Sequence, residues 1–141
     1  MANKRVYIDH LSRVDLFEGF SRRDLENVAK AGDHVTLAAG RTLFKEDQTG
    51  NDAFVVLSGS VDVSRNGRKV TTLSDGTILG ELAMIDQGPR TATAVCATDC
   101  DLLIISRARF RTLLEEVPPM AHKLMATLAG RVRDLDKRSY G

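Results

Sequence analysis

The sequence has few cysteines, almost no net charge and no long apolar run, and each shortage excludes a class of protein. Two cysteines are too few for a disulfide framework. The 20 basic and 19 acidic residues leave a formal net charge of +1, which provides no general field for a nucleic-acid backbone or an anionic bilayer. No apolar run approaches the roughly 20 residues that span a membrane. We therefore expect a cytoplasmic protein that holds any anion locally.

Constellations typical of catalysis or metal binding are also missing. The sequence has no serine elbow, no Walker-type loop and no paired general acid and base. His10, His34 and His122 lack metal-ligand spacing, and Cys96 with Cys100 would make an incomplete zinc site. We expect no enzymatic activity, no metal and no cofactor. The alternative is a catalytic or metal-dependent β-roll, which predicts bound metal or ligand turnover.

The pattern of apolar and turn-forming residues divides the chain into three parts. Residues 1–33 favour helices, with Ser21 and Asp24 resembling a capping box. Residues 34–106 hold short β-prone runs bounded by Gly, Asn or Asp, and Asn66-Gly67 is typical of a tight hairpin turn. Many short strands at regular spacing indicate a barrel or a double-sheet roll that can hold one small ligand. With 141 residues, we expect a single domain over 1–141.

The last part, residues 107–141, returns to a helical pattern. We predict one helix over Arg107–Glu116 and, after Pro118-Pro119, a longer one from about Met120 to Lys137. An apolar stripe runs along the second helix: Ala121, Leu124, Met125, Leu128, Val132 and Leu135. The preferred interpretation is that this stripe covers the roll, and the alternatives are a mobile lid or a dimer interface.

The segment from Ser74 to Val95 indicates ligand chemistry, because it places a short helical sequence inside the β region. Gly80 before a one-turn helix permits close approach of a phosphate to free backbone N–H groups. Arg90 is a fixed cation whose planar guanidinium suits phosphate oxygens. Glu81 would repel a phosphate unless it accepts a hydroxyl of the same ligand, and Thr91 adds a further hydroxyl. This combination predicts a ribose phosphate, and a cyclic one fits a small pocket best.

The same residues resemble a known motif. Gly80-Glu81-Leu82-Ala83 followed by Pro89-Arg90-Thr91-Ala92-Thr93 is similar to the phosphate-binding cassette of cyclic-nucleotide-binding domains. The upstream segment Phe44–Val63 and the flanking helices extend the resemblance to nearly the whole chain. It implies a mainly β fold with flanking helices: an eight-stranded antiparallel, jelly-roll-like β-roll with a cassette at 79–92, N-terminal helices and a C-terminal helix pair.

The resemblance also implies a role for each site residue. Glu81 would accept the ribose 2′-OH, Arg90 would pair with the exocyclic phosphate oxygens, and the backbone of Gly80, Leu82 and Ala83 would complete the phosphate site. Thr91 leaves cAMP and cGMP open, and cAMP is the favoured expectation.

Two C-terminal residues are candidates for covering the base. Arg131 is placed much as the lid arginine of bacterial channel domains, and Tyr140 is an alternative that could stack on a purine. Leu79 stands where an aromatic residue often precedes the Gly-Glu pair, and we expect this to affect packing alone.

The expected function is a regulatory module that binds a cyclic nucleotide and signals occupancy through its last helix, to a second copy or to a separate effector. We expect no membrane partner. Two alternatives stay open: a transcription regulator of the catabolite-activator type, and a roll that has drifted to another small anion. Against the first, no DNA-binding domain follows the long helix before Gly141, and the basic residues near the end alternate with acidic ones.

Overall fold

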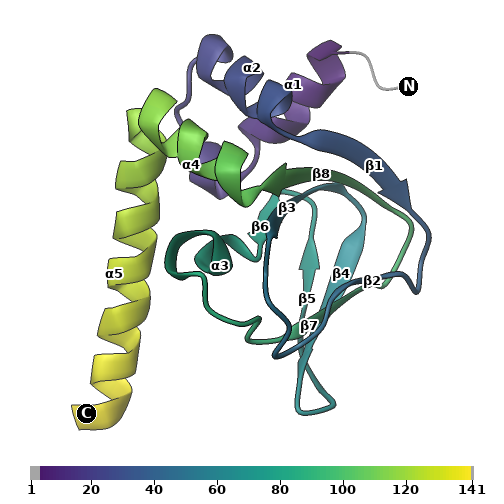
Figure 1. The fold of residues 1–141 in the computed structure, drawn as a ribbon, viewed down its shortest axis with the longest axis vertical. Helices are drawn as coiled ribbons and strands as arrows, with labels where there is room; N and C mark the ends of the chain where they lie inside the picture. The colour runs from purple at the N-terminus through teal and green to yellow at the C-terminus, as the bar shows by residue number, and fades with distance from the viewer. Residues whose placement is uncertain (1–3, 141) are drawn as a thin grey trace.

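The computed structural model describes the backbone of residues 4–140 and the side chains of residues 8–137. An N-terminal helical part packs on a β-roll, and two helices follow the roll (Figure 1). The N-terminal elements are α1 (Lys4–Ser12), the 3-10 helix η1 (Asp15–Phe17) and α2 (Arg22–Ala31). The side-chain oxygen of Ser21 accepts a hydrogen bond from the Asp24 backbone N–H at 3.1 Å, which confirms the predicted start of α2.

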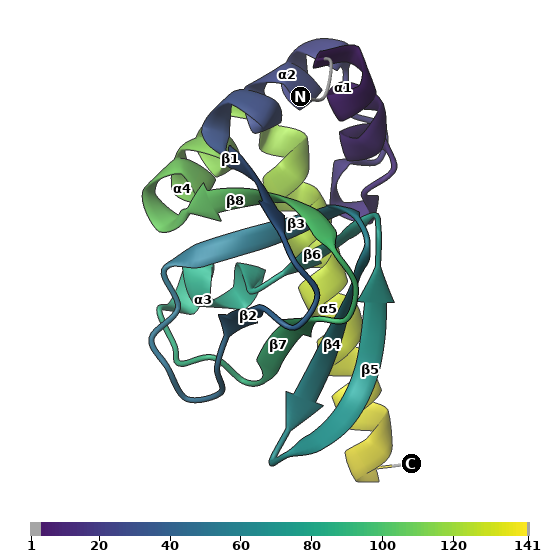
Figure 2. The ribbon, with the colours of Figure 1, turned by 90° about the vertical axis from the view of Figure 1, so that its right-hand side faces the viewer.

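Eight antiparallel strands form two four-stranded sheets that face each other (Figure 2). The strands are β1 (Asp33–Leu37), β2 (Thr42–Phe44), β3 (Asp52–Ser58), β4 (Ser60–Arg65), β5 (Arg68–Ser74), β6 (Thr77–Leu79), β7 (Thr93–Cys96) and β8 (Cys100–Ser106). One sheet has the order β1-β8-β3-β6 and the other β2-β7-β4-β5. The expected jelly-roll-like fold is therefore confirmed.

The turn between β4 and β5 has the predicted geometry. Asn66 and Gly67 both have positive φ angles, 52° and 76°, and the flanking Arg65 and Arg68 are paired. Positive φ at both central residues matches the right-handed twist of the two strands. The resulting hairpin projects beyond the roll (Figures 1 and 2).

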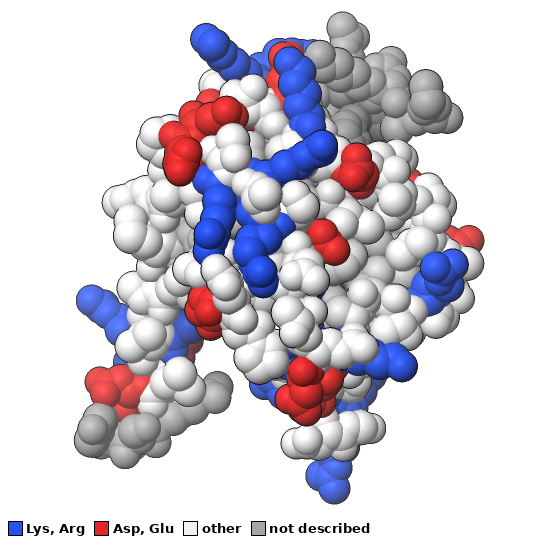
Figure 3. All heavy atoms as spheres, in the orientation of Figure 1, with Lys and Arg blue, Asp and Glu red and all other residues white. Residues whose placement is uncertain are grey.

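Three helices follow β6. They are α3 (Glu81–Asp86), α4 (Arg107–Glu116) and α5 (Pro118–Tyr140). Helix α5 begins at Pro118, earlier than the predicted Met120, because proline is tolerated in the first turn, where its missing N–H is not needed. Its distal half diverges from the β4–β5 hairpin and leaves a hollow between them (Figure 3). No helix of the described chain is long and apolar enough to cross a bilayer.

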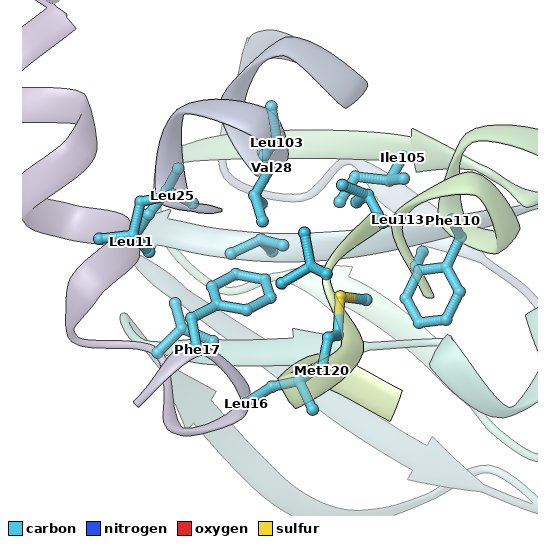
Figure 4. Packing of buried hydrophobic residues seen from close by; sticks show 14 of the residues in the cluster. Leu11, Leu16, Phe17, Leu25, Val28, Leu103, Ile105, Phe110, Leu113 and Met120 are labelled. Atoms are coloured by element: carbon cyan, nitrogen blue, oxygen red, sulfur yellow. The ribbon is translucent and has the colours of Figure 1, made fainter. Parts of the chain in front are cut away.

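Strands β3 and β8 are buried on both faces, which explains their nearly continuous apolar sequences. Alternate residues such as Val55 and Leu103 face a core shared with α1, α2, α4 and α5 (Figure 4), whereas Val56 and Leu102 face the interior of the roll. Phe110 and Met120 in the shared core are fully buried, so α4 and the start of α5 are packed firmly against the roll.

The expectation that the apolar stripe of α5 covers the roll is wrong for its distal half. Leu124 is buried and Leu128 packs against the shared core, but Val132 and Leu135 in the distal half are exposed by 64% and 61%. The distal half of the helix extends away from the shared core, so the apolar pattern continues where no core residues pack against it (Figure 1).

Candidate functional site

A cavity of about 560 Å³ lies between the α3 segment, the β4–β5 hairpin and α5. The structure brings all of the predicted site residues to its wall: Gly80, Glu81, Leu82, Ala83, Arg90, Thr91 and Arg131. The hairpin contributes apolar side chains, including Val63, Val70 and Leu73. The wall thus combines a few polar groups with apolar surface, which is typical of a small-molecule site.

The backbone of Arg90 is fixed by the loop that follows β2. The Arg90 N–H donates to the carbonyl of Gln48, and the Asp47 N–H donates to the carbonyl of Arg90, both at 2.8 Å. Thr49 and Pro89 form an isolated β-bridge beside them. These bonds set the direction in which the Arg90 side chain leaves the backbone.

The Arg90 side chain is buried, with 6% of the residue exposed, yet its hydrogen bonds are incomplete. Its Nη2 donates to the Asp52 carbonyl at 2.6 Å and its Nη1 to the Gly80 carbonyl at 3.3 Å. Its Nε has no hydrogen-bond partner among the described residues, and no carboxylate within residues 8–137 forms an ion pair with it. The ring of Phe44 lies under the guanidinium, 4.3 Å from its central carbon.

Burial lowers the pKa of Arg90 from its ordinary value, and the nearby Arg107 acts in the same direction, whereas Asp52 and Glu81 raise it. Arginine nevertheless keeps its charge in proteins. The pocket therefore holds a buried cation that is balanced by backbone carbonyls and an aromatic ring. Such a group is an effective anion acceptor, because a bound anion adds charge-assisted hydrogen bonds.

The turn into α3 requires glycine at position 80. Gly80 has a left-handed conformation with φ 77°, and an added Cβ would lie 2.2 Å from Nη1 of Arg90. No side chain caps the first turn of α3 at this residue. The backbone can thus approach both the guanidinium and a ligand closely.

Glu81 and Arg131 form an ion pair across the cavity. Nη2 of Arg131 donates to Oε1 of Glu81 at 3.3 Å. Glu81 is nearly buried, whereas about half of the Arg131 side chain is exposed. Glu81 is therefore paired with the last helix. The structure shows no ion pair between Glu81 and Arg90 among the described residues.

The remaining predicted positions differ in their surroundings. Thr91 is exposed, and its backbone carbonyl accepts a hydrogen bond from Nε of Arg65 at 3.2 Å. Leu79 is buried within the roll beside Phe54. The side chain of Tyr140 lies outside the residues whose side chains are described.

The sequence analysis missed Arg107, the first residue of α4. Its Nη2 donates to the carbonyl of Gly50 and, at 3.2 Å, to that of Ala83. The feature of the sequence that could have identified Arg107 is its positive charge at the start of a predicted helix. A cation at a helix N-terminus opposes the helix dipole, so it needs another reason to be there.

Other reactive groups lie away from the cavity. Cys96 and Cys100 are buried free thiols, and burial together with the neighbouring Cys100 raises the pKa of Cys96 to about 11. Cys96 is therefore a protonated structural side chain at neutral pH. Within the described part of the chain, no group of three or more His, Cys, Asp or Glu side chains could hold a metal ion.

Comparison with known proteins gives a consistent result. A family model described as "Cyclic nucleotide-binding domain" matches residues 34–117. The chain is 29% identical over 126 residues to the "Cyclic AMP receptor protein" of Thermus thermophilus, a match that covers 86% of this chain and 58% of that protein. It therefore spans somewhat more than half the length of this relative.

Two solved structures show the same fold. The Thermus thermophilus catabolite activator protein superimposes with a TM-score of 0.80 at 29% identity, over 88% of this chain and 61% of that one. The regulatory domain of Toxoplasma gondii PKA, solved with cAMP, superimposes with a TM-score of 0.70 at 29% identity, over 78% and 44% of the two chains.

Proposed function

The chain belongs to the cyclic nucleotide-binding domain family, and from this premise we propose that it binds cAMP in the cavity beside α3 and signals occupancy through α5. One observation carries the proposal: Arg90 lines a cavity of about 560 Å³, and its guanidinium is buried with no carboxylate ion-pair partner within residues 8–137. A phosphate of a cyclic nucleotide supplies the anionic acceptor that this group matches.

The other site residues bind different parts of the nucleotide. The backbone N–H groups of Gly80, Leu82 and Ala83 bind the phosphate together with Arg90, and Glu81 accepts the ribose 2′-OH. This assignment is supported by the position of Glu81 beside the turn at Gly80, within the same cavity wall. Thr91, at the edge of the pocket, is available to the phosphate or the purine.

The choice of cAMP over cGMP rests on the relatives. The similar proteins include one named for cyclic AMP and a regulatory domain solved with cAMP. The hydroxyl of Thr91 is compatible with either purine, so cGMP is the competing ligand within the same proposal.

The signal passes through the ion pair of Glu81 and Arg131. A ribose hydroxyl that bonds Glu81 changes the partner of Arg131, and Arg131 lies on the half of α5 that diverges from the roll. The exposed side chains of that half, Val132 and Leu135, offer a surface to a second copy or a separate effector. The domain thus acts as a receptor with no catalytic step of its own. Its buried free thiols accord with a reducing cytoplasm.

Thermal unfolding in the presence of a ligand panel tests this function. Ligand at 100 times its Kd stabilises the folded state by about 2.7 kcal/mol, which raises the Tm by roughly 5–10 °C. We expect cAMP to produce this shift and 5′-AMP, adenosine and inorganic phosphate to fail. A shift with phosphate alone would indicate a site for another small anion, and no shift with any compound would contradict the proposal.

A further inference from the structure

The side chain of Arg107 joins three segments that are far apart in the sequence. Its Nη2 donates to the carbonyl of Gly50 in the β2–β3 loop and to the carbonyl of Ala83 in α3, and its own residue begins α4. The Arg107 backbone N–H donates to the Asn51 carbonyl at 2.9 Å. The loop, the cassette helix and the first C-terminal helix therefore share one anchor.

The anchored loop also separates Arg107 from Arg90. Gly50 is buried, and an added Cβ there would lie 2.7 Å from both the Ala83 Cβ and the Arg90 Nε. The loop thus contacts α3 and Arg90 directly, with no space for a side chain. A shift of α3 or of Arg90 must move this loop, and the loop is bound to Arg107.

Arg107 is held at some electrostatic cost. Its Nε is buried without a hydrogen-bond partner among the described residues, as is that of Arg90. The two like charges disfavour each other, and neither forms an ion pair with a carboxylate within residues 8–137. Arg107 also places a cation at the N-terminus of α4, where the helix dipole opposes it. The hydrogen bonds from Arg107 to the carbonyls of Gly50 and Ala83 explain why an arginine stands at this unfavourable position.

We propose that Arg107 is a positioning residue that clamps the cassette helix α3 to the start of α4, so that nucleotide binding at α3 is transmitted to α4 and α5. The transmission part of this inference rests on the proposed function. Ala83 supplies the link, because its carbonyl binds Arg107 while its N–H is assigned to the phosphate.

The C-terminal helices can carry the displacement further. Phe110 and Leu113 of α4 and Met120 of α5 are fully buried in one cluster, so the two helices move as a packed unit at this point. Their connection consists of Val117 alone between the bounds of α4 and α5, and Val117 is buried in the same cluster. A change at Arg107 therefore reaches α5 through close packing.

Amide hydrogen exchange of Arg107→Met, with Arg111→Met as control, tests the clamp without any ligand. Met keeps the apolar stem of Arg107 and removes both hydrogen bonds, and Arg111 is an exposed residue of the same helix. We expect the amides of α3 and of residues 47–52 to exchange at least about tenfold faster in Arg107→Met, because charge-assisted bonds to two carbonyls are lost. Arg107→Lys restores a charged donor and should return most of the protection. Equal exchange in Arg107→Met and Arg111→Met would overturn the clamp.

The same variants with saturating cAMP or cGMP test the transmission. In the wild type and in Arg111→Met, nucleotide should slow exchange in α3, α4 and α5. In Arg107→Met the slowing in α4 should be lost, with recovery in Arg107→Lys, whereas α5 keeps the part of its response that depends on Glu81 and Arg131. A full response of α4 in Arg107→Met would overturn the relay, because a merely structural role leaves that response intact. If the folded wild type binds neither nucleotide, the proposed function fails and the relay with it, whereas the ligand-free exchange still decides the clamp.

Discussion

The cassette and the distal half of α5 depart from the usual distribution of side chains in opposite ways. The cassette buries charge, since Glu81 and Arg90 are only 7% and 6% exposed. The distal half of α5 exposes apolar side chains, such as Val132 and Leu135. Buried charges and exposed apolar groups are the informative exceptions to ordinary burial.

The cassette and the distal half of α5 are therefore suited to different partners. A buried guanidinium with an unbonded Nε matches a small anion, whereas an exposed apolar helix face matches another apolar surface. Arg131 connects the two regions, because it lies on the distal half of α5 and pairs with Glu81 of the cassette.

Two adjacent residues of α5, Leu124 and Met125, lie on different sides of the helix, one in the shared core and the other in solvent. Leu124→Ala should lower the free energy of unfolding by about 3 kcal/mol, because it leaves a cavity in the shared core. Met125→Ala should change it by less than about 0.5 kcal/mol, since Met125 is exposed. Urea denaturation of both variants measures the difference, and similar losses in the free energy of unfolding would show that the side of α5 carrying Met125 is packed as well.

Glycine is required in the cassette for a reason that does not apply at the hairpin turn. Gly80 and Gly67 have nearly equal φ angles, 77° and 76°, but an added Cβ would contact Arg90 only at position 80. Gly67→Ala should therefore cost about 1 kcal/mol of backbone strain and leave nucleotide affinity unchanged.

Gly80→Ala carries the same strain and also displaces the Arg90 guanidinium, so we expect at least a tenfold loss of affinity on titration with cAMP, about 1.4 kcal/mol. Equal affinities of the two variants would remove Gly80 from the site.

The negative charge of Glu81 has a ligand role that an exposed carboxylate outside the cavity lacks. Glu81→Gln keeps the side-chain length but weakens the acceptor for a hydroxyl, and we expect roughly a tenfold loss of cAMP affinity. Asp75→Asn, in the exposed turn between β5 and β6 and outside the cavity wall, is the control and should bind within about twofold of the wild type. A titration in which Glu81→Gln binds as the wild type does would leave its carboxylate without a role in binding.

The smallest effect is expected at the exposed end of the ion pair. Arg131→Gln should change the free energy of unfolding by less than about 1 kcal/mol, because about half of the side chain is in solvent. Its effect should instead be seen in the ligand-induced change of exchange in α5. A loss of several kcal/mol would mean that the pair holds the helix in place.

The sequence predicted the site better than the surfaces around it. Gly80, Glu81, Arg90 and Thr91 were identified because a glycine, a carboxylate and a cation at this spacing suit one ligand chemistry, and they line one cavity. Their roles toward a nucleotide stay predictions. Strand β6 was not separated from the cassette, because three residues are too few to show alternation.

Two features could not be read from the pattern. The apolar period of α5 was correct, but periodicity does not say how far the roll extends along the helix, and so the exposure of Val132 was not foreseen. Arg107 was missed because its function depends on two carbonyls, at Gly50 and Ala83, which no side-chain motif encodes.

Isothermal titration of cAMP into nucleotide-free wild type and Arg90→Gln tests the central claim most directly. The wild type should bind one nucleotide per chain, and Arg90→Gln should bind at least 30-fold more weakly, because a charge-assisted contact to a buried phosphate contributes about 2 kcal/mol or more. Arg68→Gln, on the exposed hairpin, should bind as the wild type does. Equal affinities of wild type and Arg90→Gln would contradict the account, as would a folded wild type that binds neither cAMP nor cGMP.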